Sequence, residues 1–307
     1  MRKQAQPMLV LEFIKLTRPL FLMGGFLLYA LGALAAVAEG HAFHLGRFIS
    51  GQLLVTSIQL MTHYVNEYFD QEGDQINTRR TWFSGGSGVL ASGTLSPRVA
   101  WMAAAVLASM GVLALISAGL QVPLVLAIGG LALAAAWSYS GPPLTLARTG
   151  WGEFSASLVV AGMVPLVGFA MQSGGAISPT LLVILVPLVL IHFAMLVAFQ
   201  VPDQEADAAC GKRTLCVRMG LERTGRLHNL SLLLAFCVIL GLFLLGWPGS
   251  QLAWLGLPVA AVQAARFQRY TRGEPGRYLW LTMRAVGLFA LTTGLWLAGY
   301  ILTLLQA

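Results

Sequence analysis

Residues 179–209 read PTLLVILVPLVLIHFAMLVAFQVPDQEADAA, an apolar run that ends in an acidic cluster. The run is long enough to cross the hydrocarbon core of a bilayer, which takes about 20 residues of helix. A helix is the expected form, because the backbone amides of a segment in lipid must bond within that segment. Asp203, Glu205 and Asp207 follow directly. The stretch therefore predicts a membrane helix with acidic residues at the end where it leaves the bilayer.

The composition of the whole chain agrees with a membrane protein. Hydrophobic residues make up 57% of the 307 residues and charged residues only 10%, against about 25% charged in a soluble domain. The excess apolar surface must therefore face lipid. The formal charge of +7 does not indicate nucleic acid, because the basic residues lie between apolar runs, where they orient a membrane protein. We expect an all-α integral membrane protein that contacts membrane lipid and binds no nucleic acid.

Apolar windows of this kind occur about nine times along the chain. Residues 9–18, before the first window, are expected to form an interfacial helix. The first window, residues 20–38, is long enough to span the membrane, with a cleaved signal peptide as the alternative. The eighth is short and is interrupted by Pro258. The approximate window centres are Ala30, Ser57, Ser109, Leu131, Ala161, Leu188, Phe236, Leu257 and Leu291.

The basic residues predict the orientation. With nine spans, 18 of the 19 lysines and arginines fall in the N-terminal segment and in alternate loops on the same side, and only Arg47 falls opposite. By the positive-inside rule that side is cytoplasmic. We therefore expect a multi-pass protein of the inner (cytoplasmic) membrane, with its N-terminus and its acidic clusters in the cytoplasm.

The acidic cluster occurs twice. Residues 70–74 read DQEGD and residues 203–207 read DQEAD. Five residues after the last aspartate a basic pair follows in each copy, Arg79-Arg80 and Lys212-Arg213, and a threonine comes next. Both copies lie at the same side of the predicted membrane. We interpret residues 1–307 as one polytopic domain with a parallel internal repeat, its motifs near 66–81 and 200–214.

The spacing of the acids indicates a metal site. Asn66, Asp70 and Asp74 are four residues apart, as are Asp203 and Asp207, so each set falls on one face of a helix. Like charges at that spacing repel unless a cation lies between them. Mg²⁺ is commonly held by one or two carboxylates together with substrate phosphate oxygens, so the two sets predict two Mg²⁺ ions bridging one diphosphate. The basic residues placed to neutralise the remaining phosphate charge are Arg80, Lys212 and Arg213.

Other signals are weaker, and each has a plain structural alternative. The acidic clusters could be solvated loop starts, although their duplication and common side favour a site. His63 either lines the site or is packed, and for His192 core packing is favoured because no partner is visible. Tyr139 could belong to an interfacial belt. Residues 84–88 (SGGSG) could cradle phosphate or form a flexible loop. Glu153 could cap a helix or pair with Arg148, and no catalytic role is expected for it.

Over nearly its whole length the chain resembles the UbiA superfamily of membrane prenyltransferases. The resemblance rests on Asn66-x3-Asp70-x3-Asp74, on Asp203-x3-Asp207 with the following GKRTL, and more weakly on residues 15–19 (KLTRP) and Tyr139-Ser140. It implies nine helices around a central lipid-accessible cavity, Mg²⁺, a polyprenyl diphosphate donor and an aromatic acceptor. The implied metal-binding and catalytic residues are Asp70, Asp74, Asp203 and Asp207, with Asn66 assisting. The implied diphosphate-binding residues are Arg79, Arg80, Lys212 and Arg213, and those facing the acceptor are Tyr139, Ser140 and Arg18.

The first motif, its FSGGSG extension and residues 139–153 look most like the branch that prenylates 1,4-dihydroxy-2-naphthoate in menaquinone biosynthesis. The implied reaction is departure of diphosphate, formation of an allylic cation and attack by the ring. Two departures from the family pattern bear on the substrate: Pro143 stands where many members have lysine, and residues 200–203 read QVPD. Alternatives are another acceptor (4-hydroxybenzoate, homogentisate, haem or another lipid precursor), a CDP-alcohol phosphotransferase, and a transporter, which the one-sided acids and the parallel repeat disfavour.

Overall fold

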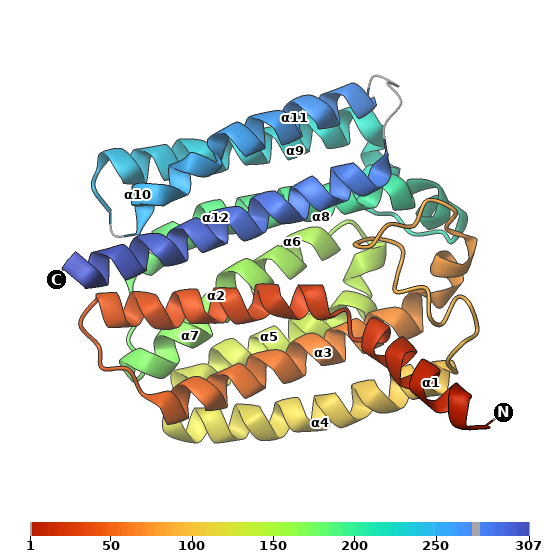
Figure 1. Cartoon of the computed structure of the whole chain (residues 1–307), viewed down its shortest axis with the longest axis horizontal. Helices are drawn as coiled ribbons and strands as arrows, with labels where there is room; N and C mark the ends of the chain where they lie inside the picture. The colour runs from red at the N-terminus through yellow and green to blue at the C-terminus, as the bar shows by residue number, and fades with distance from the viewer. Residues whose placement is uncertain (1, 248, 272–276, 307) are drawn as a thin grey trace.

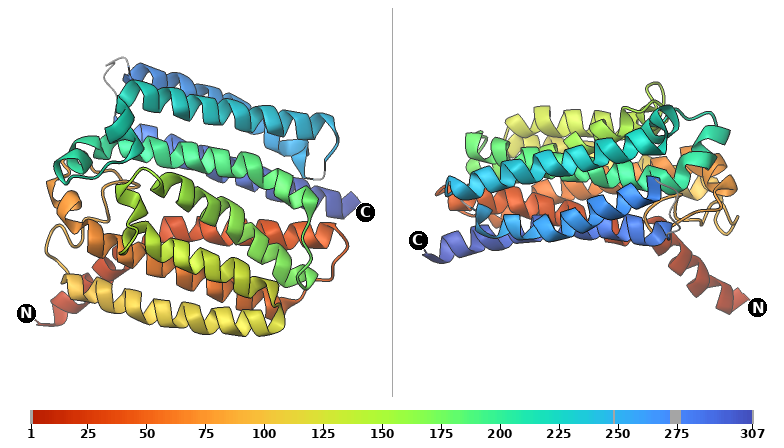
Figure 2. Two further views of the ribbon diagram at one scale, coloured as in Figure 1. Left: turned by 180° about the vertical axis from the view of Figure 1, so that it is seen from behind. Right: turned by 90° about the horizontal axis from the view of Figure 1, so that it is seen from above.

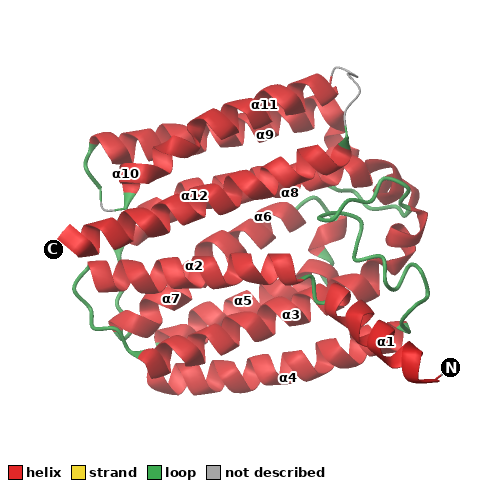
Figure 3. Ribbon diagram, in the orientation of Figure 1, coloured by secondary structure: helices red, strands yellow, loops and turns green. Residues whose placement is uncertain are grey.

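The computed structural model describes residues 2–247, 249–271 and 277–306, and this part of the chain is helical without a strand (Figure 3). The prediction of an all-α protein is thus confirmed. The α-helices are α1 (Arg2–Leu16), α2 (Pro19–Ala38), α3 (Leu45–Ile76), α4 (Pro97–Gln121), α5 (Leu124–Ser140), α6 (Gly152–Ser157), α7 (Val164–Ser173), α8 (Pro179–Ala209), α9 (Leu215–Leu244), α10 (Ser250–Ala253), α11 (Leu257–Thr271) and α12 (Tyr278–Gln306). A π-helical stretch, Leu158–Met163, joins α6 to α7.

The long helices lie side by side along one common direction (Figure 1), while α1 leaves the bundle at an angle (Figure 2). Among the described residues, six helices are long and apolar enough to cross a membrane: α2, α4, the continuous helix 152–173, α8, α9 and α12. Among the other described helices, α5 is shorter, with 17 residues, α3 has 32 residues but a polar end, and α11 has 15. All nine predicted windows fall on helical segments. The number of spans stays a prediction.

Helix ends follow local sequence signals. Proline occupies the first position of α4 and of α8, where its missing N–H costs no intrahelical bond. The preceding serine side chains, Ser96 and Ser178, accept hydrogen bonds from Arg98 N and Leu181 N, which satisfies free amides of the first turn. In both helices the serine and the proline that follows it therefore set the first residue of the helix.

The contact between α2 and α7 is a backbone contact. A Cβ at Gly32 would overlap the carbonyl of Pro165, and one at Gly168 would overlap the carbonyl of Tyr29. Glycine at both positions lets the two helices approach more closely than any side chain would allow. The two helices are therefore packed directly against each other, and α2 lies between α12 and α3 in the bundle (Figure 1).

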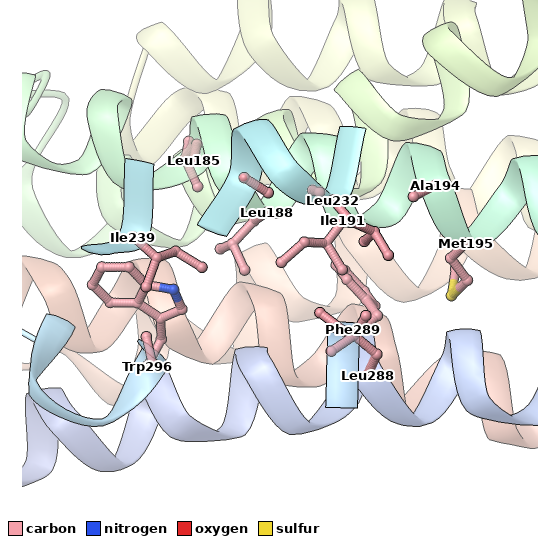
Figure 4. Close-up of a cluster of buried hydrophobic side chains, with 14 of the residues drawn as sticks. Leu185, Leu188, Ile191, Ala194, Met195, Leu232, Ile239, Leu288, Phe289 and Trp296 are labelled. Atoms are coloured by element: carbon pink, nitrogen blue, oxygen red, sulfur yellow. The ribbon is translucent and has the colours of Figure 1, made fainter. Parts of the chain in front are cut away.

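The core has two parts. One cluster of buried side chains joins α8, α9 and α12 with parts of α2 and α7. Figure 4 shows its centre, where Leu188, Ile191 and Trp296 pack among neighbouring aliphatic side chains. The other cluster joins α2, α3, α4, α5 and α7. Between the two lies a cavity of about 370 Å³, lined mostly by apolar side chains.

The connections that carry the predicted motifs gather at one end of the bundle. The N-terminal helix and the loops after α3, α5 and α8 lie at that end, and the C-terminus lies at the other (Figure 1). The two acidic motifs therefore stand at a common end, as the sequence predicts. Arg272, one of the basic residues in the orientation argument, lies outside the described residues. Which end faces the cytoplasm stays a prediction.

Candidate active site

The acidic residues of both motifs face the same cavity. Asn66, Asp70 and Asp74 from α3 line its mouth on one side. Asp203 and Asp207 from α8 line it on the other. Asp74 and Asp207 are buried, and Asp70 and Asp203 are half-buried. The fourfold spacing on each helix thus brings two motifs that are far apart in the sequence to one opening.

Lys212 connects the two motifs directly. Its ammonium nitrogen lies 3.0 Å from Asp70 Oδ1 and 3.3 Å from Asp207 Oδ1. Burial alone would lower the pKa of Lys212, but the two carboxylates outweigh it and raise the pKa above its ordinary value. Lys212 therefore remains a cation at the cavity wall throughout the physiological range.

Amide groups hold the carboxylates in place. Asn66 Nδ2 donates to Asp70 Oδ2 at 2.7 Å and to Ser140 Oγ at 3.1 Å. Asn77 Nδ2 donates to Asp203 Oδ1 at 2.7 Å. Ser140 itself lies behind Asn66 and is not part of the cavity lining, whereas Asn77 lines the cavity. No sequence pattern points to Asn77, although it stands three residues after Asp74, just past the end of α3.

The loop between α3 and α4 is ordered against the carboxylates. Gly85 N donates to Asp203 Oδ2 at 3.2 Å, and Ser87 donates to Glu67 through both its backbone nitrogen and its hydroxyl. Gly85 and Gly86 have φ of 75° and 69°, values that favour glycine. A Cβ at Gly86 would overlap the carboxylate of Asp74. Two amides of the SGGSG segment therefore already bind carboxylates, and the segment closes over the site.

Arg18 adds a second cation to the cavity. Its guanidinium forms an ion pair with Glu67, with Nε 2.9 Å from Oε1. Burial alone would lower the pKa of Arg18, but the opposite charges of Glu67 and Asp74 outweigh it and the pKa is raised. Glu67 is only 1% exposed. It precedes Asp74 by seven residues, so both point to nearly the same side of α3, and its carboxylate holds Arg18 and Ser87.

Three of the predicted diphosphate-binding residues point elsewhere in the structure. Arg79 forms an ion pair with Glu205 at 2.8 Å. Arg80 donates to the carbonyl oxygens of Gly85 and Asp74, both at 2.7 Å. Arg213 is exposed. Among the four predicted residues, only Lys212 lines the cavity. The helical register of the acids ends with α3 and α8, so it does not direct the basic residues that follow.

Polar side chains continue into the apolar part of the cavity. Tyr139, His63 and His192 line it, and His192 Nδ1 lies 3.0 Å from Ser157 Oγ. His192 is buried and packs against Phe289, as expected for a core residue, but it also has a polar partner that the sequence did not reveal. Glu153 also lines the cavity. It does not pair with Arg148, whose guanidinium donates to the carbonyl of Cys210 at 2.7 Å.

The donor set fits a hard divalent cation. Four carboxylates and two amide side chains surround one opening, and oxygen ligands are those that Mg²⁺ prefers. Within the described ranges, no three carboxylate, imidazole or thiol groups lie close enough to form a complete metal cage.

Comparison with known proteins identifies the family. The model of the UbiA prenyltransferase family matches residues 26–283. The chain belongs to this family. The resemblance inferred from the sequence motifs is thus confirmed, and the protein is a multi-pass membrane prenyltransferase of the UbiA family.

Individual UbiA relatives agree with this assignment. The chain is 28% identical over 269 residues to a 1,4-dihydroxy-2-naphthoate octaprenyltransferase of Mycobacterium tuberculosis, covering 86% of this chain and 88% of that protein. It is 27% identical over 236 residues to the Bacillus subtilis protein of the same name, covering 76% and 73%. A solved UbiA homolog from Archaeoglobus fulgidus, bound to GPP and Mg²⁺, has a similar fold, with a TM-score of 0.65, 15% identity and coverage of 95% and 99%.

Proposed function

We propose that this UbiA prenyltransferase transfers a polyprenyl group from an allylic polyprenyl diphosphate to 1,4-dihydroxy-2-naphthoate, in an Mg²⁺-dependent reaction of menaquinone biosynthesis. The observation that carries the proposal is the convergence of Asp70, Asp74, Asp203 and Asp207 with Lys212 at the mouth of an apolar cavity. The names of the two bacterial relatives support this acceptor. The GPP and Mg²⁺ in the Archaeoglobus homolog support the donor class and the metal.

The carboxylates of α3 and α8 are the proposed holders of two Mg²⁺ ions. When bound, Mg²⁺ would neutralise charge on the diphosphate and make it a better leaving group. Lys212 and Arg18 stand beside these carboxylates and add positive charge where negative charge develops on the departing oxygen. The loop at Gly85 and Ser87 covers this end of the site.

The apolar part of the cavity has a separate task. Its walls come from α2, α3, α5, the helix 152–173, α8 and α12, and they match the chemistry of an isoprenoid chain. An allylic cation reacts with water, so a lining with few polar groups favours capture by the aromatic ring. Ring attack forms the new C–C bond, and the attacked carbon then loses a proton, or carbon dioxide if it carries a carboxylate.

The direction of the site in the membrane follows from the basic residues. With the predicted alternation of spans, most of the chain's lysines and arginines fall on the same side as the acidic motifs. We therefore infer that this side faces the cytoplasm of an inner membrane, where a water-soluble acceptor and Mg²⁺ are both available.

A transfer assay with purified protein tests the function. Labelled geranylgeranyl diphosphate is supplied with 1,4-dihydroxy-2-naphthoate, 4-hydroxybenzoate or homogentisate, with Mg²⁺ or after chelation. The expected result is a prenylated naphthoate product that disappears on chelation and returns with Mg²⁺. Turnover with a different acceptor alone would correct the acceptor. Undiminished transfer after chelation would contradict the metal assignment.

A further inference from the structure

Two buried polar side chains lie in the cavity without a complete set of hydrogen bonds. Glu153, in the first turn of α6, is 4% exposed and its Oε2 has no hydrogen-bond partner. Gln200, on α8, is 6% exposed and its Nε2 has none. Both line the cavity. A carboxylate oxygen and an amide N–H₂ that are buried unsatisfied are costly, so their presence here needs a reason.

Both side chains are held in position by their surroundings. Gln200 Oε1 accepts from the backbone nitrogen of Cys216 at 2.9 Å, which directs its Nε2 away from that contact. Glu153 is fixed at the start of helix 152–173, where Gly152 packs against the backbone of Ala147 and α6 packs against α8. The Gln200 amide lies within hydrogen-bonding range of the Glu153 carboxylate, although Gln200 Nε2 and Glu153 Oε2 do not reach full hydrogen-bond geometry.

The pair lies one step deeper than the proposed diphosphate site. Gln200 precedes Asp203 by three residues and Asp207 by seven, so the three share one face of α8. Asp207 and Lys212 are the charged neighbours of Glu153. With diphosphate at the carboxylates, the reacting carbon of the donor would enter the cavity at about this depth.

We propose that Glu153 and Gln200 form the binding site for the hydroxylated edge of the aromatic acceptor. Glu153 Oε2 accepts a hydrogen bond from a ring hydroxyl, and Gln200 Nε2 donates to an acceptor oxygen. The chemistry matches because a carboxylate oxygen accepts a hydrogen bond, whereas a phenolic O–H donates one. A hydrogen bond from the hydroxyl to a carboxylate also increases electron density in the ring that attacks the allylic cation. The inference rests on the proposed function and names the residues that select its acceptor.

The variant Glu153→Gln isolates this contact, because it keeps the size of the side chain and removes the charge. The expected result is a fall of about tenfold or more in kcat/KM for 1,4-dihydroxy-2-naphthoate, with the KM for the donor nearly unchanged. Glu39→Gln is the matched control, since Glu39 pairs with Ser178 away from the cavity. Equal effects of Glu153→Gln on donor and acceptor parameters would overturn the proposal.

Acceptor analogues provide a second measurement. The two monomethyl ethers of 1,4-dihydroxy-2-naphthoate each replace one hydroxyl donor. With one of these ethers, the kcat/KM of the wild-type protein should fall by the same factor as it does for the parent acceptor in Glu153→Gln. Glu153→Gln should then show no further fall in kcat/KM with that ether. A full additional loss with both ethers would overturn the inference. If Glu153→Gln does not accumulate in membranes, Glu153→Asp keeps a carboxylate and should retain the preference for hydroxyl over ether, and loss of that preference counts against the proposal.

Calorimetric binding of 1,4-dihydroxy-2-naphthoate separates this inference from the proposed function. Weaker binding by Glu153→Gln than by wild type, without transfer by either, would support the site and contradict the function. Transfer by wild type with unchanged binding and kinetics in Glu153→Gln would contradict the site alone. Wild-type protein that neither binds nor prenylates the naphthoate would overturn both.

Discussion

Replacing Gly86 with alanine is expected to abolish most activity while leaving the protein folded. Gly86 has φ of 69° and faces the cavity, and an added Cβ would overlap the carboxylate oxygens of Asp74. The backbone there is tied down at Gly85 and Ser87, so the carboxylate of Asp74 has to move. Gly93 is a matched control in the same loop, with φ of 71° and open space where an added Cβ would lie.

Alanine at either glycine strains the backbone, but only alanine at position 86 overlaps a neighbouring side chain. Alanine at a left-handed φ costs about 1–2 kcal/mol at either position, so both variants should lose a similar amount of thermal stability. Only Gly86→Ala displaces a proposed metal ligand. A displacement on the order of 1 Å in a catalytic group can lower the rate about 100-fold. We therefore expect wild-type turnover in Gly93→Ala and a loss of about 100-fold in Gly86→Ala.

Prenyl transfer is measured at saturating donor and acceptor over a range of Mg²⁺ concentrations, with the unfolding temperature of each variant in detergent. Gly86→Ala should also need more Mg²⁺ for half-maximal rate. Wild-type rate and Mg²⁺ dependence in Gly86→Ala would refute the reasoning, as would an equal loss of rate in both variants.

Two further predictions concern the shared site and its orientation. Asp70→Asn and Asp203→Asn should each lower the transfer rate about 100-fold or more, and the double variant should be little worse than either, because groups that act as a unit are non-additive; multiplying losses would indicate two separate sites. Single cysteines at Gln75 and Ala208, both exposed, should react with an impermeant thiol reagent only after the membrane is opened, once the native cysteines are replaced; labelling from outside intact cells would contradict a cytoplasmic site.

The elements and the place of the site could be predicted because their signals are regular. Each apolar window became part of a helical segment, since lipid leaves the backbone no other partner. The spacing of four residues put Asn66, Asp70 and Asp74 on one side of α3, and the same rule applied to α8. The common side of the two motifs followed from the alternation of basic segments between the windows.

The contacts beyond the helix ends could not be predicted in this way. After Asn77 the chain is extended, with ψ of 105°, and Arg79 and Arg80 turn to partners of their own. After α8, Gly211 has φ of 69°, and the turn sends Lys212 to the carboxylates and leaves Arg213 exposed. In both motifs the basic pair follows the last aspartate at the same distance in sequence. The backbone turn that precedes each pair therefore decides which basic side chain reaches the carboxylates.

Long-range pairs were also hidden from the sequence. Glu67 stands among the acids of the first motif, but its partner Arg18 is 49 residues away, and no periodicity connects them. His192 meets Ser157 from another helix. The interpretation of Glu153 as a partner of Arg148 failed for the same reason, because the surroundings of a buried carboxylate depend on how helices are packed. Its position in the first turn of α6 agrees with the alternative interpretation as a cap.

Acidic residues of the site bind the loop between α3 and α4, and one of them, Asp203, is also a proposed metal ligand. The Asp203 carboxylate accepts hydrogen bonds from Asn77 and Gly85, and the Glu67 carboxylate accepts two hydrogen bonds from Ser87. Alanine at position 203 thus removes the hydrogen bonds that hold the loop as well as a negative charge. The loss of turnover in this variant would therefore have two causes. Asparagine keeps an oxygen that accepts one of these bonds. Alanine substitution of these acids would consequently overstate their part in catalysis, because some of the lost turnover would come from the detached loop. Substitution by the isosteric amide separates the loss of charge from the loss of the loop contacts.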